Sequence, residues 1–423
     1  MVLVTVWVFT VSHHHTALHH DMAEQFVWAH AWQLGYPKHP PLPTWLFMSA
    51  LSVLPPTPVT LYGLSALCIG LTGVFTFLAA RELLPERAAI SVALLWTLMQ
   101  PFSWRAWIYN HNTVLVMTVA LACHGTARAA RLNSIGAWLL AGLGAGLAMS
   151  TKLQAAVPLL GLLWALWRSG ALGKPGARRG LAWALALAVL VSAAPLLWMA
   201  TGHTNALAYA THQLGSGEGE GESMRMGQFL ASELRMLSPT LVVLLIWIIW
   251  AKQRHEVAPS DSAPTTSKAA LGAWVQGLLL IPLLFVLAMG MLGGAKLHAQ
   301  WGVQTFQFAP LALVIWFESA YERLPARQLL AVAAVTHVGG ADPGRDAGWA
   351  QAACAWRGRG AIRRGSWLTR CWPTGGALPR TARCVTWRRL SSRAGNWRPT
   401  PAASRRCWKT MTRPRAPGWM SPR

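Results

Sequence analysis

The feature that most constrains this chain is a series of apolar runs, each close to the length that an α-helix needs to cross a hydrocarbon core of about 30 Å. The runs lie at about 58–80, 88–107, 112–130, 134–150, 153–167, 181–200, 236–251, 271–293 and 300–317. A further run begins near Gln328 and breaks down by Gly339, and Met1–Ser12 is short for a span. Only 12% of the residues are charged, against about 25% in a soluble domain. The sequence therefore predicts an all-α integral membrane protein of about ten or eleven spans, with the first and the last truncated.

The basic residues of the loops give an independent prediction of topology. If Met1 starts inside, every strongly basic loop falls on one side of the membrane, which the positive-inside rule makes cytoplasmic. These loops hold Arg81 with Arg87, Arg128 with Arg131, residues 168–179, residues 252–268, and Arg323 with Arg327. The opposite, outer side receives residues 13–56, 105–111, 149–152, 201–235 and 294–300.

The last part of the chain, residues 338–423, has a different composition from the rest. It is rich in Arg, Trp, Cys, Pro and Gly, holds only two acidic residues, and supplies most of the formal net charge of +23. We interpret it as a disordered tail produced by out-of-frame translation, the alternative being a genuine basic, disordered tail. A tail that binds nucleic acid or anionic lipid is disfavoured because no folding pattern is present. The predicted organisation is a transmembrane module over 1–337, followed by this tail, with no nucleic-acid partner.

The first outer loop carries the densest group of polar side chains. Residues 21–35 place apolar side chains at helical spacing, as an interfacial helix does, and residues 41–54 predict a second helix too short to span. On a helix, Asp21 and Glu24 share a face, as do His20 and Glu24. Such a face can hold a divalent cation or present a carboxylate base to a hydroxyl. We interpret the individual histidines as solvated loop residues and Asp21 as functional.

Basic side chains on the outer side form a second candidate group. The positive-inside bias makes outer lysines unexpected, so Lys38, Lys152 and Lys296 suit an anionic ligand such as a lipid phosphate. The alternative is that they are snorkelling side chains at the interface. No nucleotide-binding motif is present. An outward-facing site of this kind needs an activated donor that is delivered in the membrane.

Several motifs together resemble a known family. Asp21-x-x-Glu24 in the first outer loop is followed by Tyr-Pro-Lys-His-Pro-Pro-Leu from Tyr36. Later pieces are YNHNTVL from Tyr109, STKLQAAVPL from Ser150 and GGAKLHAQWGVQTFQFAPL from Gly293. The chain over residues 1–337 thereby resembles the polyprenyl-phosphate-sugar-dependent glycosyltransferases of the GT-C class, among them protein O-mannosyltransferases, aminoarabinose transferases and lipopolysaccharide galacturonosyltransferases.

The resemblance implies roles for particular residues. Asp21 would be the catalytic carboxylate, as a general base or a metal ligand, with Glu24 assisting it. A divalent metal would be held by Asp21, His20 and Glu24. The donor phosphate would be bound by Lys152, Lys296, Lys38 and Arg105, and the substrate by Tyr36, His39, His111 and His298.

The function implied is sugar transfer with inversion, from a polyprenyl-phosphate carrier to a lipopolysaccharide, glycan or protein hydroxyl. It would take place on the outer face of a bacterial inner membrane, with membrane lipids and the sugar-loaded carrier as partners. The alternative is a transporter or flippase of lipid-linked sugars, which would use the same cationic sites without needing Asp21. The sequence identifies neither the sugar, nor the acceptor, nor the oligomeric state.

Overall fold

The structure is a computed structural model. It describes residues 18–103, 105–202, 226–253, 266–291, 297 and 299–317, together with strand residues 367–372, 383–389 and 397–399. The chain divides into two compact units, Met1–Ala341 and Asp342–Arg423. The predictions for Met1–Ser12 and for the run after Gln328 lie outside the described residues.

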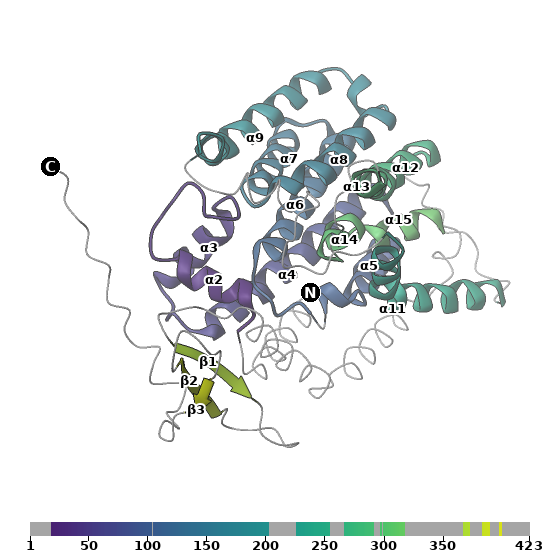
Figure 1. Ribbon diagram of the computed structural model, residues 1–423. Helices are drawn as coiled ribbons and strands as arrows, with labels where there is room; N and C mark the ends of the chain where they lie inside the picture. Colours follow the sequence, from purple (N-terminus) through teal and green to yellow (C-terminus); the bar gives the residue numbers. More distant parts are fainter. Residues whose placement is uncertain are drawn as a thin grey trace. The chain divides into compact units, whose positions relative to one another are not determined.

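The described part of the first unit is helical throughout (Figure 1). Two short helices, α2 (His20–Trp28) and α3 (Leu42–Leu51), lie in the predicted outer loop. The longer elements are α4 (Pro58–Leu83), α5 (Glu86–Thr97), α6 (His111–Leu132), α7 (Ile135–Met149), α8 (Ala156–Arg168), α9 (Ala177–Ala200) and α11 (Met226–Gln253). They are followed by α12 (Lys268–Val275), a π-helical turn (Gln276–Leu280), α13 (Ile281–Met291), α14 (Ala299–Phe306) and α15 (Ala309–Trp316).

Among these described elements, five helices are long and apolar enough to cross a membrane: Pro58–Leu83, His111–Leu132, Ala177–Ala200, Met226–Ile249 and Lys268–Met291. The predicted multi-span helical fold is therefore confirmed, but four predicted spans are shorter than these five helices. Those at 134–150 and 153–167 form the shorter apolar helices Ile135–Met149 and Leu153–Arg168, and the other two are interrupted. The run at 88–107 stops being α-helical after Thr97, where Pro101 opens a 3₁₀ turn at Gln100–Phe102, because proline removes a helical hydrogen bond. The run at 300–317 is divided between α14 and α15, with Pro310 in the first turn of α15.

Small residues allow α7 to pack closely against both of its neighbours. A Cβ at Gly144 would lie 2.4 Å from the backbone nitrogen of Ala122 in α6, and a Cβ at Gly142 would lie 2.2 Å from the carbonyl oxygen of Ala184 in α9. Such contacts are typical of helices that associate in membranes, where close backbone approach replaces the hydrophobic effect as the source of attraction. The layer α6–α7–α9 is visible in Figure 1.

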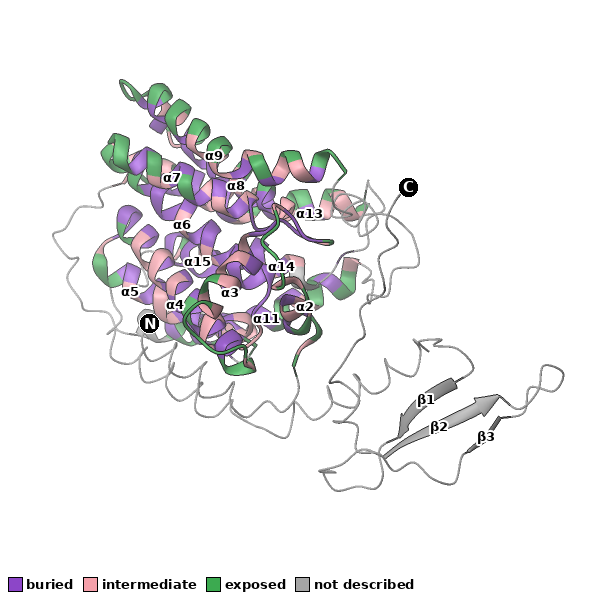
Figure 2. Cartoon of the chain, turned by 90° about the vertical axis from the view of Figure 1, so that its left-hand side faces the viewer, coloured by how far each residue is buried: buried purple, intermediate pink, exposed green. Residues whose placement is uncertain are grey.

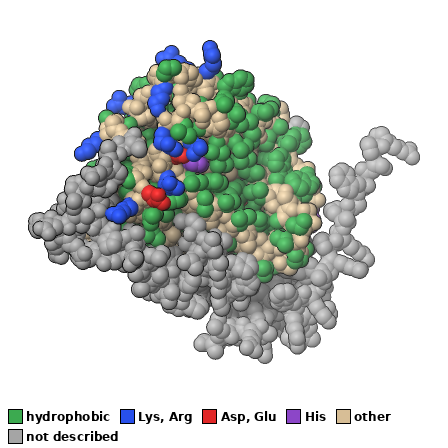
Figure 3. All heavy atoms as spheres, turned by 180° about the vertical axis from the view of Figure 1, so that it is seen from behind, with side chains coloured by type: hydrophobic (Ala, Val, Ile, Leu, Met, Phe, Trp, Pro, Cys, Tyr) green, Lys and Arg blue, Asp and Glu red, His purple; other side chains and the backbone are tan. Residues whose placement is uncertain are grey.

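The outermost helix of that layer exposes an apolar face. Leu190 and Leu197 of α9 are 76% and 64% exposed, and exposed residues line much of this helix in Figure 2. Figure 3 shows a broad face of hydrophobic side chains on this unit, with Lys and Arg side chains gathered toward one edge. Exposed apolar surface of this extent is what contact with lipid requires.

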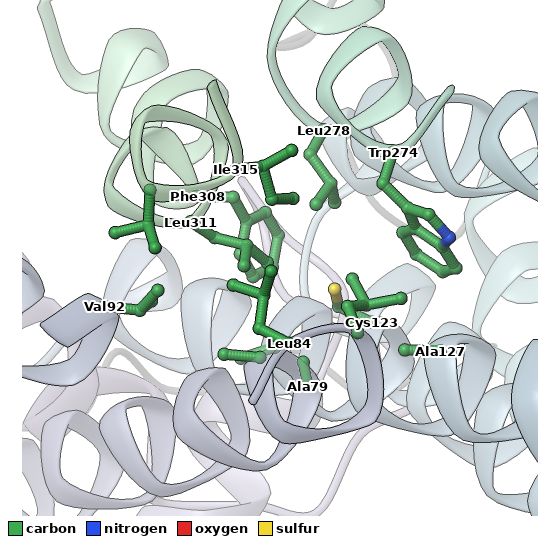
Figure 4. Close-up of a cluster of buried hydrophobic side chains, with 14 of the residues drawn as sticks. Ala79, Leu84, Val92, Cys123, Ala127, Trp274, Leu278, Phe308, Leu311 and Ile315 are labelled. Carbon is green, nitrogen blue, oxygen red and sulfur yellow. The ribbon is translucent and has the colours of Figure 1, made fainter. Parts of the chain in front are cut away.

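The core lies where α15 and α12 meet α4, α5 and α6. Phe308, Leu311 and Ile315 point toward Leu84 and Cys123 (Figure 4). Trp274 and Leu278 close the same cluster from α12 and the π-helical turn. Close packing of large side chains against alanines fixes these helices relative to one another, which holds their ends in place.

Polar contacts group the loops at the two ends of the bundle as the sequence predicted. At one end, the carboxylate of Glu82, at the end of α4, contacts Arg128 and Arg131 near the end of α6. We call Glu82, Arg128 and Arg131 the Glu82 cluster. At the other end, the backbone nitrogen of Leu42 donates to the carbonyl oxygen of Ser150 at 3.0 Å, which joins the first outer loop to the turn after α7.

The second unit contains a three-stranded antiparallel sheet, β1–β2–β3, formed by Trp367–Trp372, Arg383–Arg389 and Trp397–Pro399. Cys371 is opposite Cys384 in the β1–β2 register. The sequence predicted no regular structure here, so these strands differ from that expectation. Their Trp, Val, Thr and Cys content is compatible with a pleated surface. The other residues of 338–423 lie outside the described ones.

Candidate active site

The site begins at the first turn of α2, which holds Asp21. His19 is the N-cap of this helix, and its Nδ1 accepts a hydrogen bond from the backbone nitrogen of Asp21 at 3.3 Å. Oδ1 of Asp21 lies 3.0 Å from Nε2 of His20. The residue is only 8% exposed, although it lies in a loop that the sequence assigns to the membrane surface. The cap and the adjacent imidazole therefore fix the direction of a buried carboxylate.

Asn110 fixes the same carboxylate from the other side. Its Nδ2 donates to Oδ2 of Asp21 at 2.8 Å. Its Oδ1 is the N-cap acceptor of α6 and receives the backbone N–H groups of Asn112 and Thr113 at 2.9 and 3.0 Å. Because the cap uses the amide oxygen, the amide nitrogen is left to face Asp21. One side chain thus starts α6 and anchors the carboxylate.

The charges around Asp21 follow from this geometry. Burial raises the pKa of the Asp21 carboxyl, but the hydrogen bond from His20 and the neighbouring histidines lower it more, so that the pKa lies well below its usual range. Burial lowers the pKa of His19 to about 4, whereas the hydrogen bond to Asp21 raises the pKa of His20. Asp21 is therefore an ionised carboxylate, and His19 is a neutral acceptor.

Lys152 supplies the positive charge of the site. It follows α7 directly, and its Nζ donates to Oδ1 of Asn112 in the first turn of α6 at 2.9 Å. The same Oδ1 accepts a second hydrogen bond, from Nε2 of Gln304 in α14, at 2.9 Å. Burial lowers the pKa of Lys152 to about 8, and the charge of Asp21 opposes that shift.

The first turn of α6 thus connects the carboxylate to the ammonium group, since Asn110 binds Asp21 and Asn112 binds Lys152. We call Asp21, Asn110, Asn112, Lys152 and Gln304 the Asp21 cluster. It joins α2, α6, the turn after α7, and α14, which are far apart in the chain. An anionic base and a cation held by one helix turn can serve a proton acceptor and a leaving anion in the same reaction.

Aromatic and imidazole side chains line the neighbouring surface. The rings of His39 and His111 lie 3.6 Å apart between centroids, and both residues are buried. Burial lowers the pKa of His39 well below its usual value, with His111 and Lys152 adding to the shift. The Tyr36 hydroxyl donates to the carbonyl oxygen of Ala31 at 2.8 Å. Of the predicted substrate-binding residues, His39 and His111 therefore lie beside the cluster, while the Tyr36 hydroxyl is engaged within its own loop.

The structure does not bring all the predicted residues together. Glu24 forms an ion pair with Lys38. Arg105 is exposed in the turn that precedes Asn110. Lys296 and His298 lie outside the described residues. Among the predicted phosphate ligands, Lys152 is the one with a described hydrogen bond to the first turn of α6.

A divalent cation would meet a different set of ligands from the predicted one. The potential ligand atoms of His19, His20 and Asp21 lie within 4.8 Å of one another, and among the described residues this is the group with a metal-binding composition. His19 takes the place expected for Glu24. Two imidazoles and one carboxylate suit a first-row divalent metal and leave positions for a substrate oxygen.

Sequence reasoning assigned no role to four residues of this arrangement: His19, Asn110, Asn112 and Gln304. Asn110 carried a usable signal, because an asparagine directly before an apolar helix is a preferred N-cap. Asn112 follows from it, since the two share the first turn. Gln304 is 192 residues away from its partner in the chain, and no local pattern indicates that contact.

Comparison with known proteins gives a family model that matches part of the chain and solved structures that share its fold. The model of the family described as dolichyl-phosphate-mannose-protein mannosyltransferase matches residues 38–198. That segment, less than half of the chain, includes Asn110 and Lys152 and begins after Asp21. A search of curated proteins finds no match.

Two solved structures have the same fold. ArnT from Cupriavidus metallidurans bound to undecaprenyl phosphate is 14% identical with a TM-score of 0.57, and the alignment covers 78% of this chain and 61% of ArnT. The apo state of that protein is 15% identical with a TM-score of 0.56, covering 78% of this chain and 60% of ArnT. The chain therefore spans about three fifths of the ArnT length. The family model and the shared fold confirm the resemblance to the GT-C class that the motifs predicted.

Proposed function

We propose that this protein is a membrane glycosyltransferase that moves a sugar from a polyprenyl-phosphate carrier to a hydroxyl of a cell-envelope acceptor. The observation that carries the proposal is the first turn of α6, where Asn110 holds the Asp21 carboxylate and Asn112 holds the Lys152 ammonium. The match of residues 38–198 to a lipid-phosphate-dependent mannosyltransferase family supports the same reaction class.

In the proposed reaction, Asp21 accepts the proton of the acceptor hydroxyl as its oxygen attacks the anomeric carbon of the sugar. The bond from that carbon to the carrier phosphate breaks, and its electron pair leaves with the phosphate oxygen. Attack opposite to the leaving group inverts the configuration. Lys152 stabilises the charge that develops on the departing phosphate, because a preorganised cation in a water-poor site favours a developing anion. Deprotonation of the acceptor hydroxyl and departure of the carrier phosphate thus take place at the two ends of the Asp21 cluster.

The donor is proposed to be lipid-linked for two reasons. The sequence holds no phosphate-binding loop for a nucleotide sugar, and a protein of the same fold has been solved with undecaprenyl phosphate bound. Lys152 follows α7, and the neighbouring helix α9 exposes apolar side chains such as Leu190 and Leu197 that suit lipid. The phosphate of a lipid carrier can contact Lys152 while the polyprenyl chain remains in the bilayer.

The site is proposed to face outward, on the outer surface of a bacterial inner membrane. The loops that build it are those that the positive-inside rule assigns to that side. Acceptors available there are lipopolysaccharide, glycan and protein hydroxyls. A divalent cation at His19, His20 and Asp21 would polarise the acceptor oxygen instead of leaving Asp21 as the base. Loss of transfer on EDTA treatment and recovery with added metal would favour that role.

The test is Asp21→Asn in vesicles that contain the purified protein and polyprenyl-phosphate sugar from the host membranes. We expect sugar transfer to fall to background while membrane insertion and melting temperature stay close to wild type. Glu86→Gln, which makes the same change on the exposed carboxylate that faces Arg81, is the matched control and should transfer normally. Unchanged transfer by Asp21→Asn overturns the mechanism. Translocation of the sugar lipid without any glycosylated product would favour a flippase.

A further inference from the structure

Gln304 occupies a position in the Asp21 cluster that the proposed reaction does not explain. It comes from α14 and contacts Asn112, whose Oδ1 also receives the Lys152 ammonium, with both distances at 2.9 Å. The residue is 2% exposed. A buried amide beside a partly buried lysine is costly to keep unless its polar atoms are used.

The contacts settle which way the Gln304 amide points. An ammonium group can only donate, so the Asn112 atom that faces Lys152 must be the amide oxygen. An oxygen there can only accept, so the Gln304 atom that faces Asn112 must be the NH₂ group. The Gln304 Oε1 is therefore the atom directed away from this contact, and the usual ambiguity between amide nitrogen and oxygen is removed.

That oxygen has no hydrogen-bond partner among the described residues. Leaving a buried acceptor unsatisfied costs free energy, so such atoms in folded proteins generally meet a ligand or an ordered water. The missing group must be a donor, because two acceptors repel. An ionised phosphate oxygen cannot fill this role, whereas a hydroxyl can.

We infer that Gln304 is a specificity-determining residue that accepts a hydrogen bond from a hydroxyl of the carrier-linked sugar, next to the phosphate that Lys152 contacts. This inference rests on the proposed function. Two adjacent side chains would then recognise the two parts of the donor. Lys152 binds the phosphate anion, and Gln304 binds the sugar. The site would then distinguish the loaded carrier from the bare polyprenyl phosphate that remains after transfer, which favours release of the product.

The experiment measures binding rather than transfer, so that its failure is separate from failure of the proposed reaction. The full chain in nanodiscs is titrated with bare undecaprenyl phosphate and with the same lipid carrying a pentose or a hexose. Wild type should bind at least one loaded lipid more tightly than the bare lipid. Gln304→Met, of similar size and without polar atoms, should weaken the loaded lipid about three- to tenfold, the range for one lost hydrogen bond. Its affinity for the bare lipid should stay within twofold of the wild-type value.

Thr305→Val is the matched control. It removes a buried hydroxyl from the same helix, and the described contact of that hydroxyl is a hydrogen bond to the carbonyl oxygen of Trp301. It should change neither affinity. Equal weakening of bare and loaded lipids by Gln304→Met would mean that Gln304 acts only by holding Asn112 and Lys152, and would overturn the inference. No weakening of either lipid would also overturn it, because Oε1 would then meet only water. A wild-type protein that binds no loaded lipid better than the bare one overturns it equally.

Discussion

The two ends of the helical bundle both contain a buried carboxylate, but they neutralise it in opposite ways. At one end, Glu82 is paired with two full positive charges, Arg128 at 3.0 Å and Arg131 on its other oxygen. At the other end, Asp21 is held by an amide and an imidazole, and the nearby Lys152 is held by an amide. The Glu82 cluster pairs its carboxylate with two guanidinium groups, whereas the Asp21 cluster orients its carboxylate with an amide and an imidazole and its lysine with an amide.

This difference indicates what each end is for. Two arginines, each about half exposed, on one buried carboxylate give a joint between α4 and α6 that needs no ligand. An amide and an imidazole hold Asp21, and an amide holds Lys152, which leaves these two groups available for a hydroxyl and a phosphate. Holding charged groups in a partly buried site in this way lowers stability, and such sites are generally functional.

Among the residues that hold Asp21 and Lys152 in place, the largest expected effect comes from Asn110→Ala, which removes both the cap of α6 and the bond to Asp21. We expect kcat for sugar transfer to fall about ten- to a hundredfold, as loss of a hydrogen bond to a charged group implies. KM for the donor should change less. Steady-state kinetics in vesicles measure both. Asn110→Ser keeps a capping oxygen without reaching Asp21, so recovery of kcat by that variant would show that the cap, not the carboxylate contact, was responsible.

Breaking the Glu82 cluster should give the contrasting result. Glu82→Gln leaves two arginines facing a neutral amide, and we expect a loss of about 2 kcal/mol in the free energy of unfolding. The loss should be smaller than the ~3–5 kcal/mol of a fully buried pair, because both arginines are half exposed. Thermal melting in detergent measures it. Transfer by the protein that remains folded should be normal, and a selective loss of donor affinity would contradict the assignment of this end to structure.

The sequence predicted the two ends unequally well, for physical reasons. The helical spans follow from local apolar runs, and the predicted grouping of the loops at two ends of the bundle follows from their charges. Neither needs knowledge of packing. Asp21 and Lys152 were predicted from their motifs. Their partners were not, since Asn110 lies 89 residues from Asp21 in the chain and Gln304 lies 192 from Asn112. His19 and His20 were predicted to be solvated loop residues. His20 is exposed as predicted, whereas His19 is partly buried, and both contact Asp21 because the turn before α2 returns its cap residue onto the carboxylate.

A smaller effect should appear on changing pH, through Lys152 of the Asp21 cluster. The pKa of Lys152 is about 8 in the folded protein, below its ordinary value of 10.5, because burial disfavours the ammonium form. The unfolded chain therefore holds this proton more tightly, and the contribution of Lys152 to the free energy of unfolding rises as the pH increases from about 8 to 10.5. Phosphate binding needs the ammonium form, so affinity for undecaprenyl phosphate should fall over the same range. Titrations between pH 7 and 9.5 should show a decline of a few fold in wild type and none in Lys152→Met.

The measurement that tests the account most directly compares Lys152→Met with Arg131→Met, which remove one cation from each end. For each variant, affinity for undecaprenyl phosphate in nanodiscs and melting temperature in detergent are determined together. Lys152→Met should weaken the lipid at least about tenfold, as loss of a charge-assisted contact implies, while melting at or above the wild-type temperature. Arg131→Met should melt lower and bind the lipid within twofold of wild type. A Lys152→Met protein that binds undecaprenyl phosphate as tightly as wild type would contradict the claim that the Asp21 cluster holds the carrier phosphate.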